Sequence, residues 1–573
     1  MRRYKRGYVW GILALLLTIF SSVAVPWFLK YPIDILKQHG ATVSFYRHIG
    51  FFLAVALASA IFRFFMRRIL IGISRKIEYD LRNDLFAHLQ KLSRSFFHRY
   101  RTGDIMARAT NDINAVRNLL GPGIMYSIYT FFYTLFALTM MLKLDVRLTL
   151  LALLPFPVVA FGVNRVFRHL YRFSSKVQGI FSDLTSRVEE NFSGIRVVKA
   201  YRQEQHEIDK FLSLNRNYLR TNLRLASLRG GLFAGITLLA GFGLAIVLYF
   251  GGRDVIRGRL SLGEFVSFNT YLTTLIWPMI AIGWVINLFQ MGAASYDRLK
   301  RIFAEEPEIR DTERTDFNLR EIRGRIEVKH LCFRYTQNSD FSLEDISFTV
   351  EEGMLVAVVG ATGAGKSTLI HLLARLYEPD AGEIYIGGHE IRTIPLRLLR
   401  REVRLVPQEH FLFSESIREN IAFGEDGRFE EEQIREIAST VHIASEIESF
   451  PKGYDTLLGE RGINLSGGQK QRLTIARAAL GHPRILLLDD ALSAVDTATE
   501  RAILTNLRRK FSGSTRIIVT HRITSLTDAD LILVLDEGRL VEQGTHETLL
   551  RLGGVYANLY RKQLIEEELE RLE

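Results

Sequence analysis

Long apolar runs in the first half of the chain are its dominant pattern. Six of them approach the roughly 20 residues that a helix needs to cross a bilayer. They cover approximately residues 8–29, 49–71, 124–142, 148–163, 232–250 and 265–289. Arg63 interrupts the second run, and Pro155 and Pro157 interrupt the fourth. The pattern predicts an α-helical transmembrane domain with six spans over residues 1–305.

The segments between these runs alternate in length. Residues 72–123 and 164–231 form long, charged segments with helical periodicity, and the other connections are short. Because the long segments are rich in lysine and arginine, we expect them and the N-terminus to be cytoplasmic. At about 1.5 Å per residue, helical arms of this length would extend roughly 30 Å from the membrane.

A change of pattern separates the two halves of the chain. Residues 306–325 are charged and predict a linker, and from residue 326 short β-rich runs alternate with helical ones. This alternation predicts an α/β domain over residues 326–573.

Composition agrees with a membrane half joined to a soluble half. Hydrophobic residues make up 48% of the chain and charged residues 24%. A net charge of +12 fits either nucleic acid or anionic lipid. Anionic lipid is favoured because basic residues flank the apolar runs, as in residues 1–6. We therefore expect membrane lipid and no nucleic acid as a partner. A signal peptide is the competing interpretation of this start, but the run continues to Trp27 without a small-residue cleavage site.

A glycine-rich segment follows the apolar strand predicted at residues 355–359 and precedes a helix. It consists of Gly360, Ala361, Thr362, Gly363, Ala364, Gly365, Lys366, Ser367 and Thr368. Its spacing is that of a phosphate-binding loop, in which backbone N–H groups surround the phosphates of a nucleotide such as ATP. Lys366 is expected to reach the β- and γ-phosphates, and Ser367 is expected to bind Mg²⁺.

Further motifs follow in an order that resembles the ATP-binding-cassette (ABC) family. Leu465–Gln469 reads LSGGQ, the family signature, and an apolar strand then ends in Asp489 and Asp490. The resemblance implies that Asp489 binds Mg²⁺ and that Tyr335 stacks on adenine. It also assigns roles to Gln408, which links Mg²⁺ and the attacking water to the membrane domain, and to His521, which contacts the γ-phosphate.

The same resemblance implies a dimer, in which two cassettes hold ATP between them head to tail. Ser466, Gly467, Gly468 and Gln469 would then act on nucleotide bound to the partner, and Asp496 belongs to a loop that crosses the dimer. One chain therefore cannot complete a site, and we expect a second ABC half-transporter as partner.

Asp490 departs from the family pattern, in which a glutamate activates the attacking water. Its carboxylate is withdrawn by about 1.5 Å, and a displacement of about 1 Å can reduce the rate roughly 10²-fold. We therefore interpret the site formed by this chain's own strand motifs as degenerate, binding ATP and hydrolysing it slowly. The chain resembles the aspartate-bearing half of bacterial heterodimeric multidrug-type exporters.

The first half of the chain also resembles ABC exporters. Residues 102–112 and 193–201 are similar to the two intracellular loops of such exporters, and fusion of a transmembrane domain ahead of a cassette is typical of exporters. The resemblance implies ATP-driven export of hydrophobic or amphipathic compounds across the cell membrane.

Three alternatives remain at this point. One is a homodimeric exporter or lipid flippase in which Asp490 is a working catalytic acid. Another is a soluble ABC ATPase that acts on nucleic acid or ribosomes, although such proteins lack transmembrane runs. The third is a membrane-bound regulator that binds ATP and transports nothing.

Overall fold

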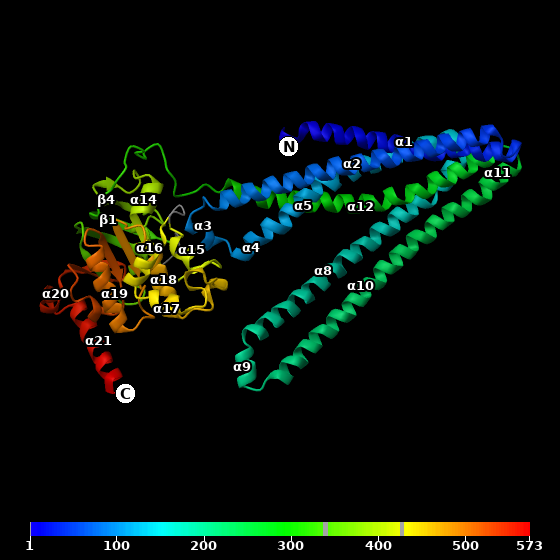
Figure 1. Ribbon diagram of the computed structural model, residues 1–573. Coiled ribbons are helices and arrows are strands. Elements are labelled where there is room, and N and C mark those ends of the chain that lie inside the picture. The colour runs from blue at the N-terminus through cyan, green and yellow to red at the C-terminus, as the bar shows by residue number, and fades with distance from the viewer. Residues whose placement is uncertain (1, 336–341, 425–428, 573) are drawn as a thin grey trace. The chain divides into compact units, whose positions relative to one another are not determined.

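The computed structural model describes residues 2–335, 342–424 and 429–572 (Figure 1). The chain forms two compact units. The first comprises Met1–Ala87 and Ile105–Ala304, and the second comprises His88–Asp104 and Glu305–Glu573. The second unit therefore contains a short piece of the segment that the sequence places between two membrane spans.

Helices alone build the first unit. Its long helices are α1 (Lys5–His39), α2 (Val43–Leu89), α6 (Ile124–Leu144), α8 (Pro155–Ser193), α10 (Glu204–Ile246) and α12 (Leu262–Ala304). Its shorter ones are α4 (Thr102–Ala107), α5 (Ile113–Asn118), α7 (Val146–Leu153), α9 (Ile195–Ala200) and α11 (Gly252–Ile256). Three π-helical turns, η2 (Arg108–Asp112), η3 (Leu119–Gly123) and η4 (Val247–Gly251), continue neighbouring helices without a break.

The core of this unit lies where α1, α6 and α12 pack together. Leu15, Met141 and Phe268 are completely buried there. Two hydroxyl groups of α12 donate to carbonyls of α1, Tyr271 to Val23 and Ser267 to Pro26, each at 2.6 Å. These bonds tie α12 to the stretch of α1 around Pro26, one of its two internal prolines, where regular helix bonding is interrupted.

By length and composition, four helical segments of the described residues are able to cross a membrane. They are Lys5–His39, Val43–Leu89, Thr102–Leu144 and Leu262–Ala304. The expected span at residues 148–163 falls across α7 and α8, and Pro155 begins α8 rather than interrupting it, a position where its missing N–H is tolerated. The expected span at 232–250 falls on the end of α10. The side chains of 156–168 and of several residues in 232–240 lie outside the described part.

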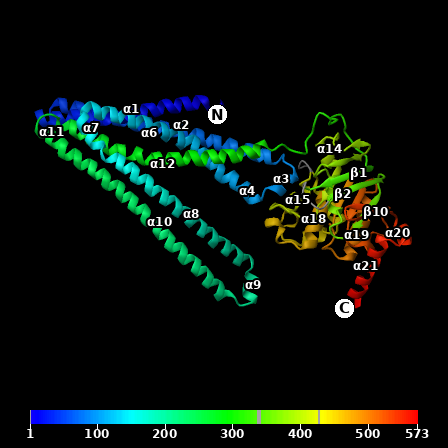
Figure 2. The same ribbon diagram turned by 180° about the vertical axis from the view of Figure 1, so that it is seen from behind.

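α8 and α10 run side by side as an antiparallel pair and diverge from the other long helices toward their tip (Figures 1 and 2). The short helix α9 joins them at this tip. Phe192, Val197 and Tyr201 are exposed there. The long charged segment 164–231 is therefore helical over most of its length, as its periodicity predicts.

The second unit contains two β-sheets. An antiparallel sheet has the order β2-β1-β4-β5, and a mostly parallel sheet has the order β10-β9-β3-β8-β7-β6. The strands are β1 (Ile326–Arg334), β2 (Ser342–Val350), β3 (Leu355–Gly360), β4 (Ala381–Ile386), β5 (His389–Glu390), β6 (Val403–Val406), β7 (Ile485–Asp489), β8 (Thr515–Val519), β9 (Leu531–Asp536) and β10 (Arg539–Gly544). β7 and β8 are buried along their whole length, as expected for central parallel strands.

Helices surround these sheets. They are α13 (Lys366–Leu373), α14 (Leu396–Glu402), α15 (Ile417–Ala422), α16 (Glu431–Thr440), α17 (Ala444–Ser449), α18 (Gly467–Ala479), α19 (Thr497–Lys510), α20 (His546–Leu552) and α21 (Val555–Leu572). The α/β architecture predicted for the second half is confirmed.

The short helix α3 (Arg94–Arg99) packs on this α/β body within the second unit. Its Phe96 is buried, and Arg94 Nη1 lies 3.0 Å from His371 Nε2 on α13. Arg99 donates to Glu305 at 3.1 Å. A segment between two predicted membrane spans thus contacts the helix that follows the glycine-rich loop.

Candidate functional site

The carboxyl ends of three neighbouring parallel strands, β3, β8 and β7, meet at one edge of the larger sheet. A cavity of about 460 Å³ lies at this edge. It is lined by Tyr335, Thr362, Gly363, Gly365, Lys366, Ser367, Thr368, Gln408, Asp489, Asp490, Val519 and His521. All of these except Val519 are residues that the sequence motifs predict. The edge of an α/β sheet where strands end is the usual place for a ligand site.

The glycine-rich loop has the backbone that a phosphate cradle requires. Gly363 and Gly365 have φ angles of +86° and +96°, which favour glycine. A Cβ at Gly360 would lie 2.1 Å from the carbonyl oxygen of Leu535. No side chain caps the start of α13, so its first N–H groups remain available to an anion.

Lys366 is buried at the floor of this loop. Its ammonium group donates to the carbonyl oxygens of Gly360 and Ala361, at 2.9 and 2.7 Å. Burial lowers the pKa of Lys366, and the nearby carboxylates of Asp489 and Asp490 oppose this effect. The cation is thus held by neutral carbonyls close to two acids, in a position to compensate the charge of a phosphate.

Ser367 and Asp489 are adjacent across the cavity, with Ser367 Oγ 2.9 Å from Asp489 Oδ1. Asp489 is 1% exposed, and burial raises its pKa while the Ser367 hydrogen bond opposes the shift. A hydroxyl, a carboxylate and the nearby Gln408 amide are the oxygen ligands that Mg²⁺ prefers, with further positions left for water and phosphate. The residues present therefore fit a nucleotide with its Mg²⁺.

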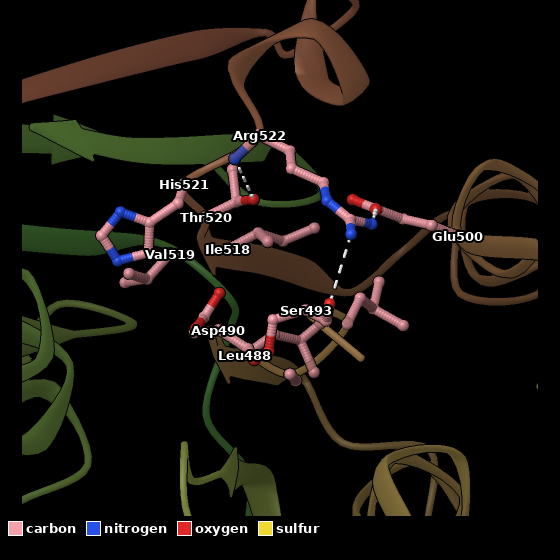
Figure 3. Close-up of a pocket in the computed structure, with 11 residues that line it drawn as sticks. Leu488, Asp490, Ser493, Glu500, Ile518, Val519, Thr520, His521 and Arg522 are labelled. Carbon is pink, nitrogen blue, oxygen red and sulfur yellow. Dashed lines mark hydrogen bonds and ion pairs between the residues drawn. The ribbon is translucent and has the colours of Figure 1, made fainter. Parts of the chain in front are cut away.

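Asp490 is half-buried and has a φ angle of +47°, which aspartate tolerates better than most residues. Its N–H donates to Val519 at 3.0 Å, and its carbonyl oxygen accepts from Ser493 Oγ at 3.1 Å. Asp490 and His521 also border an adjacent pocket of about 180 Å³ (Figure 3). Two main-chain bonds therefore fix the position from which the Asp490 side chain extends.

An arginine that the sequence analysis did not identify organises this second pocket. Arg522 pairs with Glu500 at 2.8 Å and donates to the carbonyl oxygen of Ser493 at 3.2 Å (Figure 3). It also donates to the carbonyl oxygen of Val495 at 2.8 Å. Glu500 is almost fully buried. The segment that carries His521 is thereby connected to the loop that follows Asp490. The position of Arg522 next to His521 is the only sequence signal for it.

Tyr335 stands at the other end of the cavity. Its hydroxyl lies 2.9 Å from Thr368 Oγ1, and its ring is nearly perpendicular to that of Tyr377, with centroids 5.3 Å apart. The side chain is 42% exposed. The exposed part of Tyr335 is available to a planar group such as a base.

The signature residues do not reach this cavity in the described part of the chain. Ser466 caps α18, where its Oγ accepts from the N–H of Gln469 and the Gln469 side chain accepts from the N–H of Ser466. Asp496 caps α19, and the N–H of Thr499 lowers its pKa. Ser466 and Gly467 are exposed. Ser466, Gly467, Gly468, Gln469 and Asp496 are therefore not among the described residues that line this cavity.

Comparison with known proteins agrees with the two-part architecture. Residues 8–279 match the family model described as ABC transporter transmembrane region, and residues 343–493 match the one described as ABC transporter. The chain is 38% identical over 566 residues to the probable multidrug resistance ABC transporter ATP-binding/permease protein YheI of Bacillus subtilis, covering 98% of this chain and 96% of that protein.

Two further comparisons span most of the chain. It is 34% identical over 506 residues to the ATP-dependent lipid A-core flippase of Syntrophus aciditrophicus, covering 88% of this chain and 84% of the flippase. A solved structure of a bacterial Atm1-family ABC exporter with ATP bound superposes with a TM-score of 0.79 at 29% identity, covering 98% of each chain. The predicted fold class is confirmed, and the chain belongs to the ABC transporter family as an exporter half-transporter in which a helical transmembrane domain precedes an ATP-hydrolysing cassette.

Proposed function

We propose that this chain is one half of a heterodimer that exports hydrophobic or amphipathic compounds across the cell membrane. ATP binding at its own phosphate-binding loop would be normal, and hydrolysis there would be slow. The observation that carries this proposal is Asp490, which stands in an otherwise complete nucleotide site where the family has glutamate.

The local backbone supports a slow site. A backbone shift could compensate for the shorter side chain only by moving Asp490 toward the nucleotide. Its main-chain bonds to Val519 and Ser493 oppose such a shift. A carboxylate withdrawn by about 1.5 Å is poorly placed to orient an attacking water, and such displacements reduce rates roughly 10²-fold.

The other residues of the cavity have the chemistry for binding ATP. We assign the phosphates to Lys366 and to the backbone of residues 360–368, including Gly360, Thr362, Gly363, Ala364, Gly365 and Thr368. Adenine is assigned to Tyr335. Ser367, Asp489 and Gln408 would hold Mg²⁺, which when bound neutralises charge on the phosphates. His521 is assigned to the γ-phosphate.

A partner cassette is part of the proposal. Ser466, Gly467, Gly468, Gln469 and Asp496 are not among the described residues that line this chain's own cavity, so they would serve the nucleotide held by the partner. A partner that carries glutamate at the position of Asp490 would then form the site that turns over. The basic segments 72–123 and 164–231 support a cytoplasmic position for the N-terminus and the cassettes.

The name of one relative, the probable multidrug resistance transporter YheI, supports drug-like substrates. The lipid A-core flippase supports a lipid instead. Both classes are apolar or amphipathic, which is the property that the proposal retains.

The test uses the complex of this chain with the half-transporter that copurifies with it. In vesicles, ATP-dependent dye transport is expected for the pair. Glutamate→Gln at the partner's position that corresponds to Asp490 should abolish transport, whereas Asp490→Asn should reduce it less than about threefold, because this site contributes little turnover. Equal losses in the two variants would contradict the proposed division between the sites, and absence of transport in the unaltered pair would contradict export.

A further inference from the structure

A third cavity, of about 480 Å³, opens between α1, α2, α6 and α12 of the helical unit. Its lining combines small apolar residues with hydroxyl groups, aromatic rings and one charged side chain, Arg63. Arg63 belongs to the apolar run of α2, where a charged side chain is costly and usually functional. No aspartate or glutamate is among the described residues that line this cavity.

Arg63 is exposed in the single chain and makes one long side-chain hydrogen bond among the described residues. Its Nη2 lies 3.3 Å from Ser22 Oγ, which in turn lies 2.9 Å from Ser59 Oγ. Within the described residues no carboxylate lies within ion-pair distance of Arg63. Two other arginines of the same unit are paired, since Arg298 makes two hydrogen bonds to Asp112 and Arg117 lies 3.6 Å from Glu78.

Aromatic rings provide the rest of a binding surface. Tyr129 and Tyr133 stack nearly parallel, with centroids 5.4 Å apart, and Trp277 lies against Tyr126 at 5.3 Å. Tyr129, Tyr133 and Trp277 line the cavity together with Arg63. Such a lining suits an apolar body, while the single cation suits one negative charge.

We propose that this cavity binds amphipathic anions, in which an apolar or aromatic body carries a single carboxylate, sulfonate or phosphate group that pairs with Arg63. The inference rests on the proposed export function and narrows its substrate class. The missing counter-ion of Arg63 is then supplied by the transported molecule.

The competing explanation is that Arg63 extends toward the membrane surface and only stabilises the position of α2. Arg67 and Arg68, one turn further along α2, are suited to that task. Arg63 differs from both because it lines the cavity and bonds to Ser22 of α1. Arg67 therefore provides a matched control on the same helix.

Two fluorescent probes that differ by one sulfonate test the proposal without ATP. Anilinonaphthalene sulfonate is anionic, and phenylnaphthylamine is its neutral counterpart. Their equilibrium binding would be measured on the full chain in phosphatidylcholine nanodiscs, with empty nanodiscs subtracted. Arg63→Gln should weaken sulfonate binding about tenfold or more and leave the neutral probe unchanged. Arg63→Lys should retain most of the affinity, and Arg67→Gln should behave as the unaltered chain.

Nucleotide binding to the cassette checks that each variant is folded. Equal loss of both probes in Arg63→Gln, or equal effects of Arg63→Gln and Arg67→Gln, would overturn the proposal. Adding phosphatidylglycerol to the nanodiscs separates the two sources of an anion. If phosphatidylglycerol lowers sulfonate binding only in chains that retain Arg63, the cavity binds a lipid headgroup. If phosphatidylglycerol does not compete, the cavity binds a soluble anion. Because these measurements need no transport, failure of export and failure of this inference remain distinguishable.

Discussion

Lys366 and Arg63 are both cations that line a cavity, but their surroundings differ. Lys366 is held by two carbonyls and lies near the carboxylates of Asp489 and Asp490. Arg63 has hydroxyl groups around it and no acid among the described lining residues. The first site therefore balances much of its charge internally and is organised for one defined ligand. The site at Arg63 has no such internal counter-charge, so a bound ligand would supply it.

The largest effect is expected at Lys366, since the cassette site depends on it most. Lys366→Ala should weaken nucleotide binding to this chain by about 10²–10³-fold, because the phosphates lose their buried cation. Titration with a fluorescent ATP analogue measures this. Lys329→Ala, at an exposed lysine of β1 that pairs with Glu327, is the control and should have no effect. A loss below about threefold in Lys366→Ala would show that this cavity is not the nucleotide site.

An intermediate effect is expected when Arg63 is given the partner that it lacks. Ser22→Asp would place a carboxylate beside the guanidinium and make this site resemble the cassette site. Binding of anilinonaphthalene sulfonate should fall about tenfold, and binding of phenylnaphthylamine should not change.

Ser22→Asn is the matched control for this experiment, because it adds a side chain of similar size without charge. If Ser22→Asn lowers sulfonate binding as much as Ser22→Asp does, the effect is steric, and the contrast between the two cations fails.

The smallest effect is expected at Tyr335. Tyr335→Ala should weaken nucleotide binding about fivefold to tenfold, which is the lower end of the roughly 1–3 kcal/mol that stacking of a base on an aromatic ring contributes. Tyr335→Phe should retain binding, since it removes only the hydroxyl group that contacts Thr368. Comparable losses in the two variants would assign the role to the hydroxyl group and not to the ring.

The two cavities also differ in how far the sequence predicts them. Phosphate chemistry requires glycine at positions such as Gly363 and Gly365, whose φ angles are positive, so a short local pattern identifies the cassette site. The cavity at Arg63 is assembled from four helices that are distant in sequence, and no local pattern describes it. The sequence marks Arg63 as an interruption of an apolar run and leaves open whether it contacts substrate or extends toward the membrane surface.

Contacts between distant segments explain most of the other features that the sequence did not predict. Arg94 and His371 are 277 positions apart, and nothing in either segment indicates that α3 packs on α13. The pairing of Arg522 with Glu500 also joins two separate elements, and neither segment indicates it in the sequence. Periodicity is informative within one helix, as along α8 and α10, and tertiary packing decides which side chains meet.

The central claim is that Asp490 makes this chain's own site slow. Its most direct test is ATP turnover by two copies of this chain reconstituted in one nanodisc, compared for the unaltered chain, Asp490→Glu and Asp490→Asn. We predict slow turnover in the unaltered chain, close to that of Asp490→Asn, and a rise of roughly 10²-fold in Asp490→Glu. Turnover of the unaltered chain far above that of Asp490→Asn, with little change in Asp490→Glu, would contradict the claim and identify Asp490 as a working catalytic acid.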